Sequence, residues 1–181
     1  MKTINETHLK IAEELIKYLI LTPMLLSAFV IDYKLQIIPN RLNMTMFEIG
    51  IILMFLAGIF NANIAIDMFF GMLAGAGIFL IITLVGGLIA GKEAMGFGDV
   101  KLMGALGIFF GLTNTIAITL MSFLIGAILS IILLATKVKK TDEYIPFGPF
   151  IVMAAFIAMV VPFSTILSVL LFIFSLGLIR I

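Results

Sequence analysis

The sequence contains no cysteine and a single histidine, and only 12% of its residues are charged. The absence of cysteine excludes disulfides, thiolate metal sites and cysteine nucleophiles. The one histidine, His8, lies in the polar amino-terminal stretch, which argues against a Ser-His-Asp triad or a multi-histidine metal site. Chemistry in this chain is therefore expected to rest on carboxylates.

The scarcity of charge is matched by an excess of apolar residues, which make up 63% of the chain, with a mean hydropathy of +1.31. Soluble domains are about 45 to 50% apolar and about 25% charged, because a charged surface must enclose the core. The composition thus predicts an all-α, polytopic transmembrane helical bundle. A net charge of +1 gives no reason to expect a nucleic-acid partner.

Runs of about 20 apolar residues are long enough to cross a bilayer as helices, and six or seven are expected here. Residues 1–14 mix lysine with glutamate, so we interpret them as a polar, interfacial segment rather than a cleaved signal peptide, and residues 15–181 as one transmembrane domain. The last stretch is either one kinked helix or two helices broken at Pro162. The expected spans are 15–30, 46–60, 66–90, 99–111, 115–135 and 146–181.

Connections that contain lysine or arginine alternate with connections that contain neither, and this alternation predicts the orientation of the protein in the membrane. Three connections are basic and the two between them, residues 61–63 and 112–114, hold no Lys or Arg. The positive-inside rule then places the basic connections in the cytoplasm and the amino terminus outside. The basic residues are Lys34 and Arg41, then Lys92 and Lys101, then Lys137, Lys139 and Lys140.

Small residues in two of the spans are expected to let helices approach closely. They are Gly71, Ala74, Gly75, Gly77 and Gly126.

Five carboxylates lie near the spans, where ionisable groups are costly and often functional. Residues 45–48, Thr-Met-Phe-Glu, match a capping box, so Glu48 is expected to serve a helix start. Asp67 is expected to complement the dipole of another helix start. Glu93 lies in a basic connection. Asp32 and Asp99 remain, and both fall on the cytoplasmic side.

Asp32 and Asp99 form the candidate catalytic pair, although simpler roles stay open. Asp99 follows Gly96 and Gly98 and could be an ordinary helix N-cap. Asp32 lies where the first span ends, before Pro39 and Asn40, and could be an interfacial acid.

Four ordered segments carry a resemblance to the type IV prepilin peptidase family. Gly-Phe-Gly-Asp at 96–99, continuing Val-Lys-Leu, resembles the GxGD signature of that family. Asp32 with Ile-Pro-Asn at 38–40 is similar to its first aspartate region. Residues 91–95 and 145–150 also look like family segments, so the resemblance runs from about residue 25 onward.

The resemblance implies an intramembrane aspartic endopeptidase that removes the basic leader of prepilins or pseudopilins at the cytoplasmic face of the inner membrane, with Asp32 and Asp99 as its catalytic residues. Larger members carry an insert with paired CxxC motifs and also methylate the new amino terminus. Because this chain has no cysteine, it is closer to the short forms serving Tad or Flp pili or to preflagellin peptidases, and methylation stays open.

Two neighbouring carboxylates cannot both ionise cheaply, so one keeps a proton and the pair can hold a water between an acid and a base. Such a pair needs no metal or other cofactor. Asp99, at a helix start, is expected to be the ionised member and Asp32, at a helix end, the protonated one. Gly96 and Gly98 would leave backbone open to an extended substrate. Lys101 and Glu93 would either shape the site electrostatically or have salt-bridge or interfacial roles.

A function of another class uses the same aspartates. In a small transporter or a pilus-assembly subunit they would relay protons or bind a cation, without cleaving any precursor.

Overall fold

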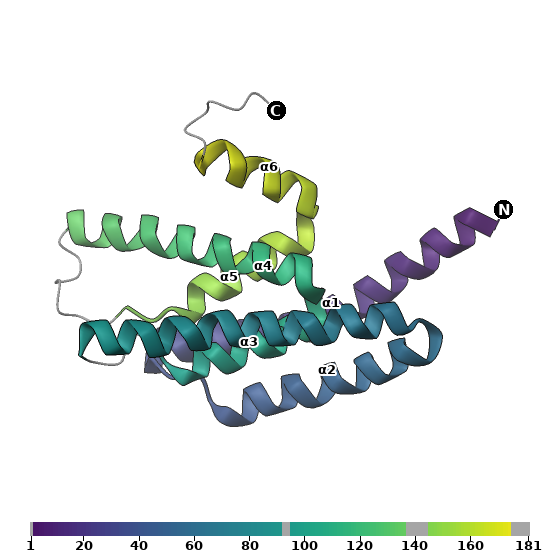
Figure 1. The fold of residues 1–181 in the computed structure, drawn as a ribbon, viewed down its shortest axis with the longest axis horizontal. Coiled ribbons are helices and arrows are strands. Elements are labelled where there is room, and N and C mark those ends of the chain that lie inside the picture. The colour runs from purple at the N-terminus through teal and green to yellow at the C-terminus, as the bar shows by residue number, and fades with distance from the viewer. Residues whose placement is uncertain (1, 92–94, 137–144, 175–181) are drawn as a thin grey trace.

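The computed structural model describes residues 2–91, 95–136 and 145–174, and all regular secondary structure within these ranges is helical. Within the described ranges, six helices follow one another (Figure 1). Their bounds are α1 Lys2–Leu35, α2 Asn40–Phe60, α3 Ala62–Ala90, α4 Phe97–Ala135, α5 Gly148–Val160 and α6 Phe163–Phe174.

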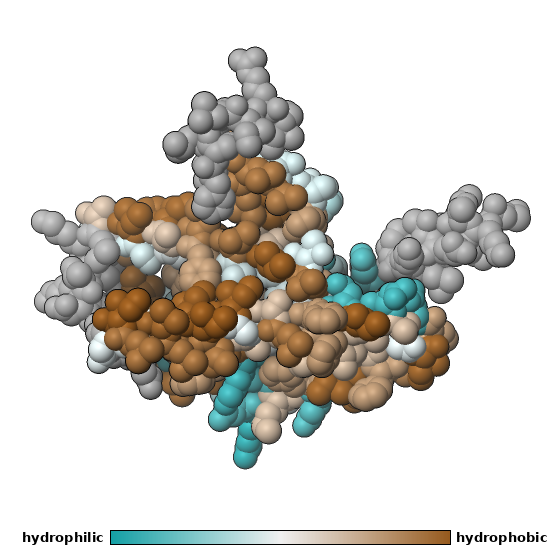
Figure 2. Space-filling model, viewed as in Figure 1, coloured by the Kyte–Doolittle hydropathy of each residue, from teal (hydrophilic) through white to brown (hydrophobic). Residues whose placement is uncertain are grey.

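Among the described residues, four helical stretches are long and apolar enough, by length and composition, to cross a membrane, namely Glu14–Leu35, Asn40–Phe60, Ala62–Ile89 and Phe97–Leu133. Figure 2 shows hydrophobic residues over most of the described surface on the face in view. An exterior this apolar is suited to lipid, where helices satisfy all their backbone polar groups internally. The predicted class, an all-α polytopic membrane bundle, is confirmed.

Helix α4 consists of two helices joined at Gly111. This glycine has φ 72° and ψ 177°, a conformation that side-chain-bearing residues rarely adopt. The chain reverses there, so the two parts of α4 run in opposite directions (Figure 1). The break expected between the fourth and fifth spans is confirmed.

Asp67 stabilises this reversal. Its carboxylate accepts a hydrogen bond from the Leu112 amide at 3.2 Å, and a Cβ atom on Gly111 would overlap it. The expectation that Asp67 serves the start of its own helix is wrong, because α3 begins at Ala62 and has no acid in its first turn. Asp67 instead caps the second part of α4.

Glycines bring α3 and α4 into backbone contact. A Cβ atom on Gly71 would overlap the backbone of Gly107, and one on Gly107 would overlap that of Gly71. A Cβ atom on Gly75 would overlap the Met103 carbonyl. The expected close approach is confirmed at Gly71 and Gly75 but is wrong for Gly77, which has no other group within 4 Å of its Cβ position.

The capping box expected at residues 45–48 does not exist. Helix α2 begins at Asn40, six residues earlier than expected for the span, and Thr45 donates from within the helix to the Arg41 carbonyl at 2.9 Å. Glu48 is exposed in the middle of α2. Pro39 is the residue that starts this helix, in the extended conformation that precedes a first turn.

Helix α1 is continuous from Lys2 to Leu35, and its apolar stretch begins at Glu14, so the division expected between residues 14 and 15 stays a prediction. Of the two alternatives for the last stretch, the structure shows two helices broken at Pro162, α5 and α6. The number of spans, six or seven, stays a prediction.

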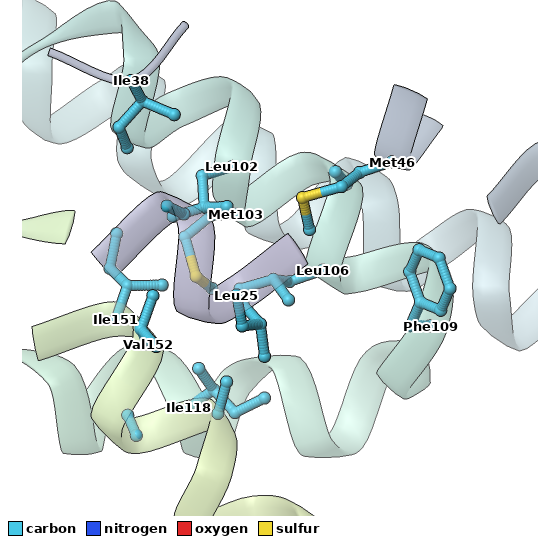
Figure 3. Close-up of a cluster of buried hydrophobic side chains, with 14 of the residues drawn as sticks. Leu25, Ile38, Met46, Leu102, Met103, Leu106, Phe109, Ile118, Ile151 and Val152 are labelled. Atoms are coloured by element: carbon cyan, nitrogen blue, oxygen red, sulfur yellow. The ribbon is translucent and has the colours of Figure 1, made fainter. Parts of the chain in front are cut away.

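The largest apolar cluster lies where α1, α4 and α5 meet. In Figure 3, Ile151 and Val152 of α5 lie beside Met103 of α4 and Leu25 of α1, all of which are completely buried. This packing fixes the beginning of α5 against the two helices that carry the candidate aspartates.

Candidate active site

Asp32 lies in the last turn of α1, just before the chain leaves the helix. The Gln36 amide closes that turn on the Asp32 carbonyl at 2.8 Å, and Gln36 itself adopts a left-handed conformation with φ 56°. A left-handed residue is a common helix terminator. The chain is then non-helical as far as Pro39, whose ring disfavours helical backbone at the preceding residue.

Asp99 lies in the first turn of α4. Its amide donates to the Gly96 carbonyl at 3.0 Å, and its carboxylate is close to the backbone amide of Gly96. Because α4 begins at Phe97, Asp99 is inside the first turn rather than at the N-cap position considered from the sequence.

A cleft of about 310 Å³ joins the two aspartates. One wall is the stretch from Gln36 to Ile38, and the other is the stretch from Met95 to Asp99. Asp32 and Asp99 are each 4% exposed, so the cleft reaches carboxylates that are otherwise shielded. The structure thus brings together two acids that are far apart in the sequence.

The two carboxylates are close enough for the charge of Asp32 to act on Asp99. One oxygen of each, Oδ2 of Asp32 and Oδ1 of Asp99, is buried without a hydrogen-bond partner in the described part of the chain. Two neighbouring buried carboxylates favour a state in which they share a proton. The arrangement therefore suits an acid and a base acting together.

Helix α5 contributes a residue that the sequence did not reveal as part of the site. The backbone amide of Gly148, at the first position of α5, lies against the Asp32 carboxylate. A Cβ atom on Gly148 would overlap that carboxylate. The segment 145–150 resembles the family, but a local pattern carries no signal for a contact with residue 32.

The start of α5 also bears on which aspartate is ionised. A helix amino terminus favours a negative charge, and Asp32 lies beside that of α5 while Asp99 lies in the first turn of α4. The sequence predicts that Asp99 is ionised and Asp32 protonated, because only the carboxyl end of a helix is expected beside Asp32. The amino terminus of α5 beside Asp32 removes that reason. Helix termini alone do not distinguish the two.

The other residues expected at the site are placed as follows. Gly96 and Gly98 line the cleft, and Gly98 packs so closely on Ile38 that a Cβ atom there would lie 3.1 Å from the Ile38 Cβ. Lys101 donates to the Asn40 side chain at 2.8 Å, next to the half-buried Pro39. Glu93 lies outside the described residues.

Asn43 is a second residue that the sequence did not reveal. It is 1% exposed, and its side-chain amide donates to the Gly98 carbonyl at 3.1 Å. An asparagine four residues after a helix-starting proline has no distinctive local pattern. Its role depends on α4 passing beside α2.

The fold and the cleft define a polytopic helical membrane protein that holds a buried pair of aspartates between its helix ends. Residues 19–131 match the model of the type IV leader peptidase family. The chain belongs to this family.

The chain is similar to curated proteins of several bacteria that are all named prepilin leader peptidase/N-methyltransferase. The prepilin leader peptidase/N-methyltransferase of Aeromonas hydrophila is 31% identical over 141 residues, which are 78% of this chain and 48% of that protein. That of Pseudomonas aeruginosa is 34% identical over 146 residues, covering 78% and 48%. That of Legionella pneumophila is 35% identical over 138 residues, covering 75% and 46%.

The chain thus spans about half the length of the curated relatives it matches. No solved structure matches it.

Proposed function

We propose that this protein is an aspartic endopeptidase of the inner membrane that removes the leader peptide from prepilin-like precursors. The single observation that carries the proposal is the cleft shared by Asp32 and Asp99. Membership of the type IV leader peptidase family supports it, and the relatives' names supply the class of substrate.

The reaction uses one proton shared by the two carboxylates. The ionised carboxylate takes a proton from a water molecule, whose oxygen bonds to the carbonyl carbon of the scissile peptide, while the protonated partner gives its proton to the carbonyl oxygen. The tetrahedral intermediate then collapses. The C–N bond breaks, the nitrogen leaves with a proton from the pair, and a new carboxyl group remains on the leader.

The walls of the cleft support binding of an extended peptide. Gln36 to Pro39 is non-helical, as are Met95 and Gly96, so backbone groups of both walls lie outside regular helix. Ile37 and Phe97 are 61% and 52% exposed. An extended segment entering between them would reach both carboxylates.

A cytoplasmic position of the cleft is part of the proposal. Three exposed cations, Lys34, Arg41 and Lys101, lie near the helix ends that form it. Cytoplasmic connections of membrane proteins are enriched in such residues. The leader of a precursor would be cut on that side.

The transporter alternative finds less support. A proton or ion path needs further polar groups through the depth of the membrane. Among the described residues Asp32 and Asp99 are the only buried carboxylates, and the buried hydroxyls of Thr83, Thr115 and Thr119 donate to carbonyls of their own helices.

The test is incubation of purified protein with precursors that carry a basic leader and a hydrophobic stem, followed by mass spectrometry of the products. Cleavage at one site near the leader junction is expected, and it should persist with chelators and without S-adenosylmethionine. Activity that chelators remove and one metal restores would contradict the water-activating pair. Methyl transfer can be scored in the same reaction by adding S-adenosylmethionine.

A further inference from the structure

Two polar contacts connect the first turns of α2 to the beginning of α4, on either side of Asp99. One joins Asn43 to the Gly98 carbonyl at 3.1 Å, and the other joins Asn40 to Lys101 at 2.8 Å. The Lys101 contact is exposed, and exposed contacts of this kind contribute little. The Asn43 contact is part-buried and comes from a side chain that is 1% exposed, so it is the one better able to hold a fixed geometry.

The Asn43 side chain is a poor choice for stability alone. It is 1% exposed, and its Oδ1 atom has no hydrogen-bond partner in the described part of the chain. A buried polar atom without a partner is costly, and an apolar side chain of similar size would avoid that cost. In the described part of the chain, the side chain makes its polar contact through Nδ2 alone, which donates to the carbonyl of Gly98, the residue before Asp99.

The position of Asn43 also connects it to Asp32. Helix α2 follows α1 after the short stretch 36–39, so the part of the chain that carries Asn43 begins directly beyond the turn of Asp32. Ile38, in that stretch, packs on Gly98 and on Gly148. Apolar contacts of this kind set distance but not direction, whereas a hydrogen bond to a carbonyl orients the peptide group.

We propose that Asn43 is a positioning residue of the peptidase site, whose amide holds the Gly98 carbonyl and thereby orients Asp99 toward Asp32. The inference rests on the proposed function, because it assigns Asn43 a part in that reaction. Its geometric content does not depend on activity and can be measured separately.

The geometric test uses the absence of cysteine from the native chain. Ile37 and Phe97 are exposed on opposite walls of the cleft, so Ile37→Cys and Phe97→Cys together accept a pair of spin labels. We expect a narrow distance distribution in this background and a clearly broader or shifted one when Asn43→Leu is added. Thr45→Val is the matched control, because Thr45 is exposed on α2 and bonds only within its own helix.

The kinetic test uses Asn43→Leu and Asn43→Asp without labels. Loss of one buried hydrogen bond that orients a catalytic group should lower kcat by about tenfold or more, with KM changed less than about twofold. In Asn43→Asp, the introduced carboxyl group cannot donate to the Gly98 carbonyl while it is ionised at neutral pH, whereas its protonated form can. The activity of Asn43→Asp relative to the native protein should therefore rise as the pH falls.

The ratio of Asn43→Asp activity to native activity separates the titration of residue 43 from that of the other groups near the site. The titratable groups of the neighbouring segments, Asp32 on α1, Arg41 on α2, and Asp99 and Lys101 on α4, are the same in both proteins. A merely structural role would lower the amount of folded protein in a pH-dependent way. Both proteins are therefore compared at equal amounts of folded protein at each pH, where a merely structural role leaves the ratio constant.

The outcomes separate the two proposals. Unchanged label distances with Asn43→Leu would overturn the positioning role whether or not the protein cleaves anything, and so would a ratio for Asn43→Asp that does not vary with pH. Failure of the native protein to cleave any precursor, with broadened label distances in Asn43→Leu, would remove the proposed function and leave the geometric inference standing.

Discussion

At the residue scale, the cleft requires two carboxylates to be buried together, at 4% exposure each. Burial and mutual repulsion both disfavour charge on the pair. A hydrophobic or amide side chain would remove that cost, so the pair lowers the stability of the molecule. This is the balance expected when a group is present for its chemistry.

The first prediction concerns the aspartates themselves. Asp32→Asn and Asp99→Asn should each lower precursor cleavage by at least about a hundredfold, because either change removes one half of an acid–base pair. The double variant should be hardly worse than either single one, since effects within such a unit are not additive. The measurement is the rate of precursor conversion at matched protein amounts.

Glu48→Gln is the control, because Glu48 is exposed in the middle of α2 and should be dispensable. Asp67→Asn should also cleave well, since asparagine keeps an oxygen that can accept from Leu112. Near-normal cleavage by either aspartate variant would show that the residue is not catalytic.

The second prediction concerns Gly148. Gly148→Ala places a methyl group where the Asp32 carboxylate lies, so Asp32 must move. A displacement of about 1 Å in a catalytic group can cost about a hundredfold in rate. We expect a loss of that order in kcat with little change in thermal stability, measured side by side in detergent.

Ala154→Gly, a buried position further along α5, serves as the matched control for a one-carbon change in this helix. It should lower the unfolding temperature without a comparable loss of kcat. A fully active Gly148→Ala variant would mean that the start of α5 does not determine the position of Asp32.

At the element scale, α3 and α4 are held together by a contact that only glycines allow. The backbones of Gly71 and Gly107 meet directly. In lipid, where apolar burial drives helix association weakly, such close packing supplies much of the attraction. The same pair of helices carries the reversal at Gly111 that Asp67 stabilises.

The third prediction compares two glycines in these helices. Gly107→Ala should destabilise the protein by about 1 to 3 kcal/mol, because the added methyl group overlaps the backbone of Gly71. Gly77→Ala meets no other group within 4 Å and should be neutral or slightly stabilising, since alanine favours helix. Thermal unfolding in detergent distinguishes the two, and equal unfolding temperatures would contradict the close contact.

At the scale of the whole molecule, the cleft and the α2–α3 turn occupy opposite ends of the long helices. The cleft lies beside the α1–α2 connection and the start of α4, whereas Asn61 lies at the far end of α2 (Figure 1). If the cleft faces the cytoplasm, the α2–α3 turn must face the other side of the membrane.

The fourth prediction is this orientation. Reporters inserted in residues 137–143 should be cytoplasmic, because that connection holds three of the lysines, and reporters at 61–63 should be outside. Residues 137–143 lie outside the described part of the chain, so the prediction rests on charge alone. The opposite result, with 137–143 outside and 61–63 in the cytoplasm, would mean that the cleft does not face the cytoplasm, where leaders are expected to be cut.

Hydropathy and short motifs determined the class of this protein and the two acids of its cleft. Apolar runs of helical length can cross lipid only as helices, so the all-helical membrane fold and the reversal near Gly111, between two such runs, could be predicted. The candidate pair could be predicted from the short motifs around Asp32 and Asp99. Helix starts were less predictable, because Pro39 outweighed the Thr45–Glu48 pattern six residues further on.

Tertiary structure alone decided which distant residues support the pair. Asn43 meets Gly98 across 55 positions of sequence, and Asp67 meets Leu112 across 45. Gly148 reaches Asp32 because α5 packs against α1 and α4. A hydrogen bond between separate helices depends on how closely and at what angle they pack, and side-chain shape along their whole length sets both, so no local pattern encodes it.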